Sequence, residues 1–379
     1  MNRILIVAGE NSGEKHGAAL VRKFKDLQPS YQFFGIGGEK MAKAGVNILF
    51  PIEEMSVMGI FEVLSKLRRI TAIFRSIKRE IHTQKPDAAV LIDAPDFNLR
   101  LARILRKQKV PVLYYISPTV WAWRKGRLKT IKKNVDKMLL IFPFEEKIYK
   151  RNEIPASFVG HPLLESVKTS LTKTSFFQKY GLEKHKKLIC LLPGSRHNEI
   201  DQHLPILMKS LTLIKRKKTW QFILVRAENI DVSTLQCHIP PPLKDTLILD
   251  EDRYDAIAYS NLVLAACGTA TLEAALLGTP VVTFYRISPL TYLLGKPFVN
   301  IKEYSIVNIL SGERILPELI QKDFTDENVF LEANKILSSQ EIQQHMQEKY
   351  SKVKEILSKG NLKASLNAAR ELEKLILNS

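Results

Sequence analysis

The sequence is poor in cysteine, in long apolar runs and in acidic residues. It has three cysteines among 379 residues, Cys190, Cys237 and Cys267, and no CxxC pair. This odd, scattered set argues against a disulfide framework and against a cysteine zinc site, and it suits a reducing cytoplasm. No apolar segment is long enough to span a bilayer, and the apolar run at the N-terminus is too short for a signal peptide. We interpret that run as a first strand.

The shortage of acidic residues leaves a strong positive charge. The chain has 57 Lys and Arg against 39 Asp and Glu, a net charge of +18. Such an excess indicates an anionic partner, which nucleic acid, phospholipid headgroups or a phosphorylated substrate would each provide. The sequence has no zinc-finger, RRM or KH signature. It also has no GxGxxG motif, no P-loop lysine, no internal repeat and no low-complexity tract.

Short apolar runs alternate with helical patterns through both halves of the chain. The helical patterns in the first half include Glu14–Leu27, Phe61–His82 and Leu99–Gln108. Strands are predicted at Ile4–Ala8, Gln32–Gly35, Ala88–Ile92, Val112–Ile116, Lys137–Ile141, Leu188–Leu192, Gln221–Val225, Thr246–Leu249, Leu262–Ala265 and Val281–Thr283. This alternation predicts an α/β protein with two Rossmann-like, doubly wound domains that face a cleft, followed by C-terminal helices.

The predicted domains are residues 1–165, 166–337 and 338–379. The last segment is helical and charged, and it would pack back on the first domain or on a partner subunit. The second alternative would make the protein a homodimer. Open parallel sheets bind their ligands at the carboxyl ends of the strands. The loops after the strands are therefore where we expect the chemistry.

Two strand-end loops in the first half carry carboxylates. The turn after the first strand brings Glu10 and Ser12 to the expected cleft, unless Ser12 merely caps the next helix. Asp93 directly follows a buried strand, where partial desolvation raises the pKa of a carboxyl towards the range of a general base. We interpret Asp93 as the catalytic base and Asp96 as a helix cap. Asn98 is a cleft or capping residue in the same loop.

A third loop in the first half combines aromatic and basic side chains. It holds Trp121 and Trp123, and Arg124 follows directly. Two tryptophans beside an arginine suit stacking on a sugar or base, or a wall for an acyl chain. A packed aromatic corner is the structural alternative.

The second half contains features typical of an anion site. Ser195 and Arg196 follow a strand, and backbone N–H groups with a guanidinium would suit a diphosphate. Gly268 and Thr269 begin a helix whose free N–H groups favour a phosphate. Glu273, one turn further, is placed to accept two sugar hydroxyls, and a capped core helix with one exposed Glu is the alternative.

Two further stretches have more than one interpretation. Asp250-Glu251-Asp252 resembles the DxD of metal-dependent sugar transferases, but we interpret it as a capping, solvated acidic turn and expect no metal and no cofactor. The segment 57–69 mixes an apolar face with clustered bases, which suits an anionic membrane surface or an ordinary core-facing helix. The residues proposed for membrane contact are Met58, Ile60, Phe61, Leu64, Arg68 and Arg69.

Taken together, the loops resemble the lipid-A-disaccharide synthase family. The residues that carry the resemblance are those of segments 9–13, 57–59, 92–98, 117–124, 160–162, 192–196 and 268–273, in the family's order. The blocks 92–98 and 117–124 are highly specific, whereas 268–273 is shared with many GT-B transferases. Glu14 and His16 depart from the pattern, and residues 305–308 depart except for Asn308.

The resemblance implies a GT-B fold and an inverting, metal-independent glycosyltransferase. It would join UDP-2,3-diacylglucosamine to 2,3-diacylglucosamine 1-phosphate, giving a β-1,6 disaccharide and UDP on the pathway to lipid A. It further implies a bacterial peripheral membrane protein, on the cytoplasmic side of the inner membrane, that binds no nucleic acid. The donor would contact Arg196, Ser195, Gly268, Thr269, Glu273 and Asn308, and the acceptor would give its proton to Asp93.

Two other classes of function remain open at this point. Another GT-B enzyme acting on a UDP sugar, such as an epimerase or a peptidoglycan-type transferase, would keep the block 268–273 but not the blocks around Asp93 and Trp121. A basic nucleic-acid-binding protein would explain the charge but not the strand-end loops. Turnover of a UDP sugar separates the enzymes from the binding protein.

Overall fold

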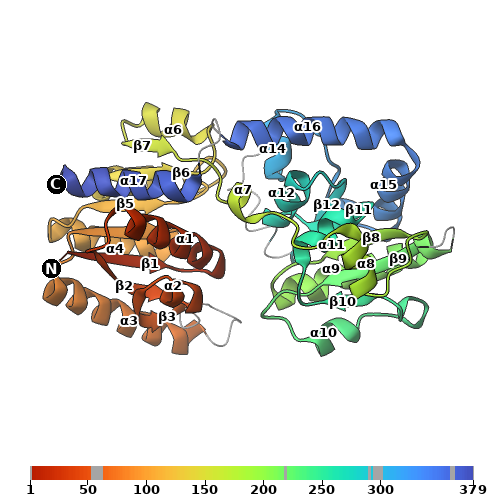
Figure 1. Ribbon diagram of the computed structural model, residues 1–379, viewed down its shortest axis with the longest axis horizontal. Helices are drawn as coiled ribbons and strands as arrows, with labels where there is room; N and C mark the ends of the chain where they lie inside the picture. The colour runs from red at the N-terminus through yellow and green to blue at the C-terminus, as the bar shows by residue number, and fades with distance from the viewer. Residues whose placement is uncertain are drawn as a thin grey trace. The chain divides into compact units, whose positions relative to one another are not determined.

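A computed structural model describes residues 2–52, 63–216, 220–288, 292, 302–358 and 363–378, without the side chains of Asn11 and of residues 63–68. The chain forms two compact units, each built on a parallel sheet (Figure 1). Unit 1 comprises Met1–Pro162 with Leu357–Ser379, and unit 2 comprises Leu163–Ile356. None of the helices in the described part of the chain is long and apolar enough to cross a membrane.

Unit 1 has a sheet of seven parallel strands in the order β3-β2-β1-β4-β5-β6-β7. These are β1 (Arg3–Ala8), β2 (Gln32–Gly37), β3 (Val46–Pro51), β4 (Ala88–Ile92), β5 (Val112–Tyr115), β6 (Lys137–Leu140) and β7 (Ala156–Phe158). All five residues of β4 are buried, because helices cover both faces of the sheet. That double cover explains why the central strands read as continuous apolar runs.

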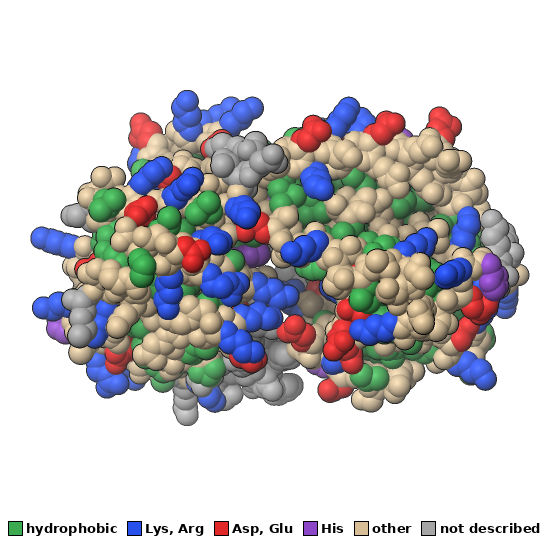
Figure 2. All heavy atoms as spheres, in the orientation of Figure 1, with side chains coloured by type: hydrophobic (Ala, Val, Ile, Leu, Met, Phe, Trp, Pro, Cys, Tyr) green, Lys and Arg blue, Asp and Glu red, His purple; other side chains and the backbone are tan. Residues whose placement is uncertain are grey.

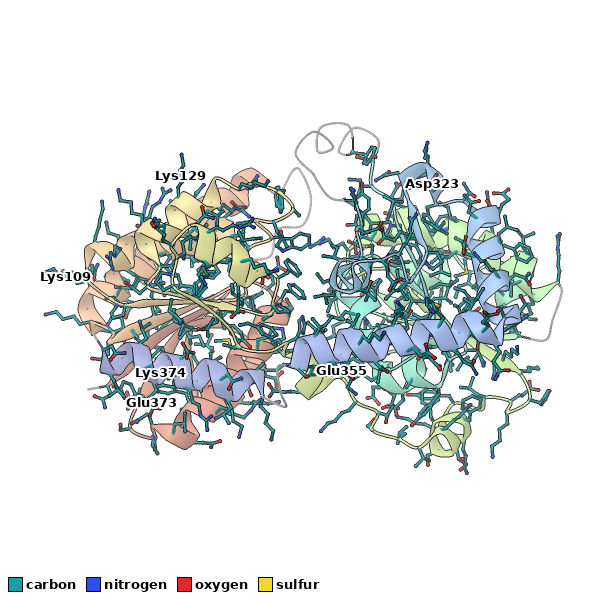
Figure 3. All side chains as sticks on the ribbon, turned by 90° about the horizontal axis from the view of Figure 1, so that it is seen from above. Lys109, Lys129, Asp323, Glu355, Glu373 and Lys374 are labelled. Carbon is teal, nitrogen blue, oxygen red and sulfur yellow. The ribbon has the colours of Figure 1, made fainter. Side chains whose placement is uncertain are left out.

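The helices of unit 1 lie in two layers. Residues of α1 (Asn11–Leu27), α2 (Glu39–Lys43) and α17 (Ala364–Leu377) pack in one apolar cluster with one face of the sheet. Residues of α3 (Val63–Gln84), α4 (Pro95–Lys107), α5 (Arg127–Asn134) and α6 (Glu145–Arg151) pack in a second cluster with the other face. In Figure 3, Lys129 projects from the α5 side of this unit, and Glu373 and Lys374 lie on α17 at its other side.

Unit 2 has a sheet of six parallel strands in the order β10-β9-β8-β11-β12-β13. The strands are β8 (Lys187–Leu192), β9 (Trp220–Val225), β10 (Leu247–Leu249), β11 (Leu262–Ala266), β12 (Val281–Tyr285) and β13 (Glu318–Ile320). The helices are α7 (Leu163–Ser166), α8 (Lys173–Lys179), α9 (His197–Lys215), α10 (Val232–Gln236), α11 (Arg253–Tyr259), α12 (Thr269–Leu276), α14 (Ile306–Ser311), α15 (Asp326–Ser338) and α16 (Gln340–Ser358), with 3₁₀ turns at Pro241–Leu243 and Gln321–Asp323.

The C-terminal segment is shared between the two units. Helix α16 is tied to unit 2, where Lys349 pairs with Glu313. Helix α17 packs on α1 in unit 1, and Asn367 Nδ2 donates to the carbonyl of Val159 over 2.8 Å. The expected single segment 338–379 therefore corresponds to one helix on each unit.

Three strands were not predicted, and all three lie at sheet edges, namely β3, β7 and β13. A polar residue interrupts the apolar run in each of them, Asn47 in β3, Ser157 in β7 and Glu318 in β13, whereas the fourth edge strand, β10, is an unbroken Leu-Ile-Leu and was predicted. The ten predicted strands are present with ends shifted by at most two residues. Edge strands are the part of a doubly wound sheet that hydrophobic pattern alone detects least well.

Candidate active site

The first candidate site lies in unit 1, where the strand order reverses between β1 and β4. The loops that follow these neighbouring strands meet at the carboxyl edge of the sheet. A Cβ added at Gly9 would lie 2.1 Å from the Cβ of Ala94, so only glycine permits this approach of the two loops. Glu10 and Asp93 are thereby brought to one edge, as the sequence predicts.

The backbone around Asp93 is held in an unusual conformation. Asp93 and Ala94 have φ angles of 49° and 43°, in the left-handed region that costs free energy for residues other than glycine. Asn98 Nδ2 donates to the carbonyl oxygens of Ile92 (3.1 Å) and Asp93 (2.8 Å). The hydroxyl of Tyr114 donates to the Asp93 carbonyl over 2.5 Å. These contacts fix the turn and hence the direction of the Asp93 side chain.

The electrostatic surroundings of Asp93 suit a base. Burial, followed by the negative charge of Glu10, raises the pKa of Asp93 to about 6, against the opposing effects of the Ala94 N–H and Arg127. A carboxyl with such a pKa is ionised at neutral pH yet is a stronger base than an exposed aspartate. The pKa of Asp93 is therefore raised, which is the direction that the sequence predicts.

Two details of this loop differ from the sequence-based expectation. Asp96 caps no helix, because α4 has Ala94 at its N-cap position, and the Asp96 carboxylate instead pairs with Arg124 and Arg127. Asn98 is fully buried and holds the turn, so it does not face a sugar acceptor. Partners that the sequence does not show decide both. In the loop after β1, Ser12 does not cap α1, because Glu10 occupies the N-cap position, and this excludes the alternative interpretation of Ser12.

The two tryptophans after β5 have different surroundings. Trp123 is exposed, and its Nε1 donates to Thr119 Oγ1 over 2.8 Å. Trp121 packs edge-on against Phe144, and its buried Nε1 has no hydrogen-bond partner among the described residues. Trp121 thus belongs to a packed aromatic corner, whereas Trp123 offers a surface to a ligand.

A buried polar group behind this loop has no counterpart in the predicted site. Ser117 Oγ lies 2.7 Å from the hydroxyl of Tyr149, and Ser117 also bonds to Glu145. Burial raises the pKa of Glu145 to about 8. Burial also lowers the pKa of His16 to about 4, so this imidazole is neutral at pH 7. Nothing in the sequence pattern separates Glu145 from an ordinary acidic residue in the first turn of a helix.

The second candidate site lies in unit 2, at the reversal of strand order between β8 and β11. Gly194, with φ 135°, lets the loop after β8 turn back over Glu199. One oxygen of Glu199, Oε2, accepts the backbone N–H groups of Ser195 (2.8 Å) and Arg196 (3.2 Å). The expectation that these N–H groups receive a diphosphate is therefore wrong, because Glu199 already holds them.

The remaining anion-binding features of unit 2 are accessible. The side chain of Arg196 is 69% exposed, with one guanidinium nitrogen 3.5 Å from Glu199 Oε1. Helix α12 begins at Thr269 with no side-chain cap and no acidic residue in its first turn. A Cβ added at Gly268 would meet nothing within 4 Å, so space lies in front of the helix N-terminus. An uncapped N-terminus with open space before it is suited to a phosphate.

Glu273, one turn further along α12, is buried and forms an ion pair with the partly exposed Arg253. Its Oε2 accepts hydrogen bonds from Arg253 Nε (2.9 Å) and from a terminal guanidinium nitrogen of Arg253 (2.6 Å). The residue is only 8% exposed. The exposed Glu of the alternative interpretation is thus excluded, and Arg253 is a partner that the sequence did not indicate.

Asn308 proves to be a structural residue. It is fully buried, its Nδ2 donates to Leu316 and Glu318, and its Oδ1 accepts the N–H groups of Ile315 and Leu316. Because every hydrogen-bonding position of the Asn308 side chain is used inside unit 2, the side chain does not contact a sugar-nucleotide donor. The expectation that Asn308 binds this donor is therefore wrong.

His203 of α9 links two strand-end loops and was not predicted. Its Nδ1 lies 2.6 Å from the carbonyl of Pro193 after β8, and its Nε2 accepts the N–H of Arg286 after β12 over 3.0 Å. These contacts define a neutral imidazole with the proton on Nδ1, and burial lowers its pKa. A lone histidine on an apolar helix carries no sequence signal for such a contact.

The acidic turn 250–252 is engaged in ion pairs. Asp252 pairs with Lys179 over 2.6 Å and accepts the hydroxyl of Tyr180 over 2.9 Å, while Asp250 pairs with Arg226. Asp252 occupies the N-cap position of α11 without a side-chain cap, so the expected capping is absent. Among the residues that the structure describes, no group of three His, Cys, Asp or Glu could hold a metal ion.

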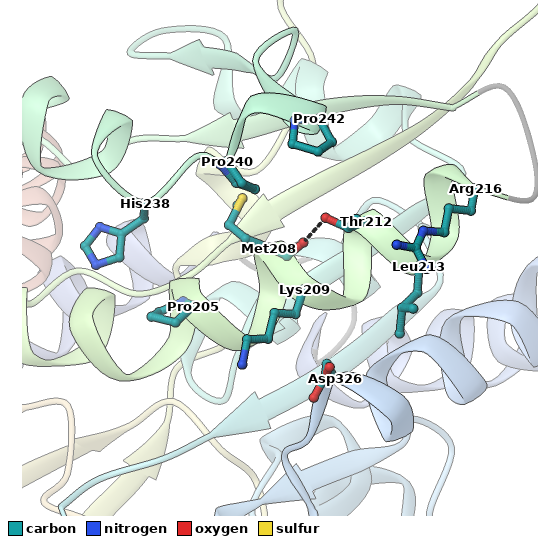
Figure 4. A pocket seen from close by; sticks show the side chains of 10 residues that line it. All are labelled: Pro205, Met208, Lys209, Thr212, Leu213, Arg216, His238, Pro240, Pro242 and Asp326. Atoms are coloured by element: carbon teal, nitrogen blue, oxygen red, sulfur yellow. Dashed lines mark hydrogen bonds between the residues drawn. The ribbon is translucent and has the colours of Figure 1, made fainter.

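A hollow lies on α9. It has a volume of about 440 Å³ and is lined mainly by residues of α9 with Pro240, Pro242 and Asp326 (Figure 4). None of the predicted site residues lines it.

Known proteins of one family match almost the whole chain. The family model described as lipid-A-disaccharide synthetase matches residues 4–372. The chain belongs to this family. The lipid-A-disaccharide synthase of Geobacter sulfurreducens is 40% identical over 360 residues, covering 95% of this chain and 94% of the relative. That of Coxiella burnetii is 36% identical over 376 residues, covering 99% of both chains.

Solved structures resemble the fold at low sequence identity. A UDP-GlcNAc 2-epimerase from Neisseria meningitidis has a TM-score of 0.64 at 13% identity and covers 100% of both chains. The calicheamicin glycosyltransferase CalG4 has a TM-score of 0.63 at 13% identity, covering 99% of this chain and 98% of its own. These likenesses confirm the predicted GT-B fold, and membership of the family confirms the predicted class, a glycosyltransferase of lipid A biosynthesis.

Proposed function

We infer that this chain transfers a diacylglucosamine unit from UDP-2,3-diacylglucosamine to the 6-hydroxyl of 2,3-diacylglucosamine 1-phosphate. The products would be the β-1,6 disaccharide 1-phosphate and UDP. The observation that carries this proposal is the match of residues 4–372 to the lipid-A-disaccharide synthetase family. The strand edges supply the groups that such a reaction needs, namely a base in unit 1 and an anion site in unit 2.

In the proposed mechanism Asp93 removes one proton. As its carboxylate accepts the proton of the acceptor's 6-hydroxyl, that oxygen attacks the anomeric carbon of the donor, and the bond from this carbon to the diphosphate breaks. One in-line displacement inverts the configuration and needs no protein nucleophile. Glu10 supports the step because its charge helps to raise the pKa of Asp93.

The leaving UDP would be stabilised by unit 2. We place its phosphates at the uncapped N-terminus of α12, at Gly268 and Thr269, with the exposed Arg196 as a charged donor. Glu273 would accept the ribose hydroxyls through Oε1, since Oε2 is bonded to Arg253. Ser195 keeps only its hydroxyl for this site, because Glu199 holds its N–H.

Acceptor binding would involve the surfaces around Asp93. Glu10, Ser12 and Trp123 are exposed on these loops, which supports a role in holding the sugar. Trp121, packed against Phe144, would help to hold the loop that carries Trp123. The substrates carry acyl chains, so a hydrophobic wall beside the sugar is required.

We further propose that unit 1 contacts an anionic membrane on the cytoplasmic side of the inner membrane. Met58, Ile60 and Phe61, suggested for this contact, lie outside the described residues, and the side chains of Leu64 and Arg68 do too. Arg69 is exposed on α3. The adjacent helices α3, α4 and α5 carry fourteen Lys and Arg against two Asp and Glu, which supports attraction to anionic lipid.

The test is incubation of the purified protein with both diacylated substrates in detergent micelles. Mass spectrometry should detect the disaccharide 1-phosphate, and UDP should form in equal amount. Isomerised UDP sugar without disaccharide would instead indicate an epimerase. Neither product, from a folded protein, would refute the proposed function.

A further inference from the structure

Two arginines and one tryptophan form a fixed cluster next to the proposed base. The guanidinium carbons of Arg124 and Arg127 lie 4.5 Å and 5.2 Å from the ring centre of Trp123. The ring is itself anchored by its hydrogen bond to Thr119. Stacking on an aromatic face limits the rotation of a guanidinium and leaves its N–H groups to bind an anion. We call Arg124, Arg127 and Trp123 the arginine cluster.

The arginine cluster holds one solvent-facing carboxylate. Asp96 Oδ1 accepts a hydrogen bond from Arg124 over 3.1 Å and from Arg127 over 2.8 Å. The Asp96 side chain is 73% exposed, whereas that of Arg127 is only 11% exposed. A single exposed carboxylate bridging two guanidinium groups leaves one positive charge uncompensated. A phosphate, with more charge and more acceptor oxygens, fits such a pair better than a carboxylate.

The arginine cluster also lies within electrostatic reach of the base. The positive charge of Arg127 acts to lower the pKa of Asp93. Tyr114, whose hydroxyl is bonded to the Asp93 carbonyl, responds to the charges of both Arg127 and Asp96. A substrate whose hydroxyl contacts Asp93 would therefore bring a neighbouring anionic group near these arginines.

We propose that Arg124 and Arg127 form the subsite for the phosphate of the acceptor, and that Asp96 occupies this subsite until the phosphate displaces it. The inference rests on the proposed function, since it assigns a part of the same acceptor. Arg124 and Arg127 are positioning residues in this scheme. They bind a group that does not react and so direct the acceptor's hydroxyl to Asp93.

The test compares two acceptors, one with and one without the 1-phosphate, at fixed donor concentration. The proteins are the wild type, Arg124→Gln, Arg127→Lys and the matched control Lys125→Gln, whose exposed lysine lies between the two arginines in the sequence. The wild type and the control should prefer the phosphorylated acceptor by about ten- to a hundredfold in kcat/KM. Both arginine variants should lose most of this preference through a higher acceptor KM, with an unchanged donor KM.

Asp96→Asn distinguishes a displaced counter-ion from a structural ion pair. If Asp96 only anchors the arginines, its loss should raise the acceptor KM. If it competes with the phosphate, its loss should lower the KM of the phosphorylated acceptor and leave that of the other acceptor unchanged. Melting curves establish that each variant is folded.

The failures of the two proposals have different signatures. Disaccharide formation with an undiminished phosphate preference in both arginine variants would overturn the subsite and leave the proposed function standing. A raised acceptor KM in Asp96→Asn would overturn the displacement of Asp96. Absence of disaccharide from wild-type protein with either acceptor would overturn the proposed function and the subsite together.

Discussion

The two units share one topology and differ in charge. In each sheet the first six strands of the unit, numbered along the chain, have the order 3-2-1-4-5-6. Unit 1 nevertheless has 33 Lys and Arg against 17 Asp and Glu, whereas unit 2 has 24 Lys and Arg against 22 Asp and Glu. The net charge is therefore +16 in unit 1 and +2 in unit 2. Figure 2 shows many basic side chains on the visible face of unit 1. The charge of the chain thus belongs almost wholly to one of two similar folds.

At the carboxyl ends of the strands the charge difference is reversed, with acidic groups exposed in unit 1 and a basic group exposed in unit 2. The edge of unit 1 offers carboxylates, with Glu10 exposed and Asp93 shifted towards a base. In unit 2 the comparable carboxylates are engaged internally, Glu199 by backbone N–H groups and Glu273 by Arg253. What remains accessible there is the N-terminus of α12 and the largely exposed Arg196, which pairs with Glu199 over 3.5 Å. Two sheets of one topology therefore expose different charged groups at their carboxyl edges.

The largest expected effect is on the base of unit 1. Asp93→Asn should lower kcat by about 10²–10⁴-fold, because the amide cannot accept the proton. The pKa of Asp93 is raised to about 6 in the folded protein, so the ionised carboxylate destabilises the fold above that pH. Asn is not ionised, so Asp93→Asn should melt no lower than the wild type above pH 6. Turnover and melting curves at pH 8 measure both, with the exposed Asp26→Asn as control. Near-normal turnover in Asp93→Asn would exclude it as the base.

The second prediction separates two donor residues of unit 2. Arg196→Ala should weaken donor use by about 1.5–3 kcal/mol without loss of stability, since its side chain is largely exposed. Glu273→Ala should weaken donor use and also destabilise the protein by about 1.5–3 kcal/mol, because it removes the charge-assisted hydrogen bonds to Arg253, whose side chain is partly exposed. Donor kinetics and urea unfolding test the pair. Equal stability of the two variants would show that the Glu273 ion pair is not important for folding.

The third prediction compares the surface charge of the units. Arg68→Glu with Arg69→Glu should weaken binding to anionic vesicles by about 1 kcal/mol per charge or more. The same reversal at Lys184 and Lys244, both exposed in unit 2, should have little effect. Vesicle co-sedimentation at two salt concentrations measures this difference. Equal losses from both units would mean that net charge alone governs binding.

The fourth prediction concerns the shift of the base. Since Asp93 acts when ionised, kcat/KM should rise with pH through about 6. Glu10→Gln removes a negative charge that raises this pKa, so the midpoint should move to lower pH, whereas Glu10→Asp should leave it nearly unchanged. The pH profiles of the three proteins provide the comparison. An unmoved midpoint in Glu10→Gln would assign the rising limb to another group.

The smallest expected effect concerns metal. Activity should survive EDTA. Asp252→Asn should cost about 0–1 kcal/mol of stability through its pair with Lys179, with turnover unchanged. If EDTA abolished activity and a divalent ion restored it, the acidic turn 250–252 would again be a candidate metal site.

The central strands and the strand-end loops were predictable, because buried parallel strands form continuous apolar runs and the topology places their ends together. The position of Asp93 at the end of a buried strand was predicted in this way, and its role as the base stays a prediction. The assignments that failed, such as Asp96, Asn98 and Asn308, depended on hydrogen-bond partners distant in sequence. Three of the four edge strands were missed because a polar residue interrupts their apolar run.

The partners of the site residues were also beyond prediction. Arg253 is 20 residues before Glu273, and His203 reaches Arg286 across 83 positions. The sequence has no periodicity at such separations. A single sequence therefore indicates which loops carry chemistry more readily than which groups neutralise one another.

The central claim is that unit 1 supplies the base and unit 2 alone binds the nucleotide. Its most direct test is calorimetric titration of UDP into the wild type, Asp93→Asn and Arg196→Ala. We predict that Asp93→Asn binds UDP as tightly as the wild type, and that Arg196→Ala binds it about ten- to a hundredfold more weakly. Weakened UDP binding in Asp93→Asn, with wild-type affinity in Arg196→Ala, would contradict the division between the units.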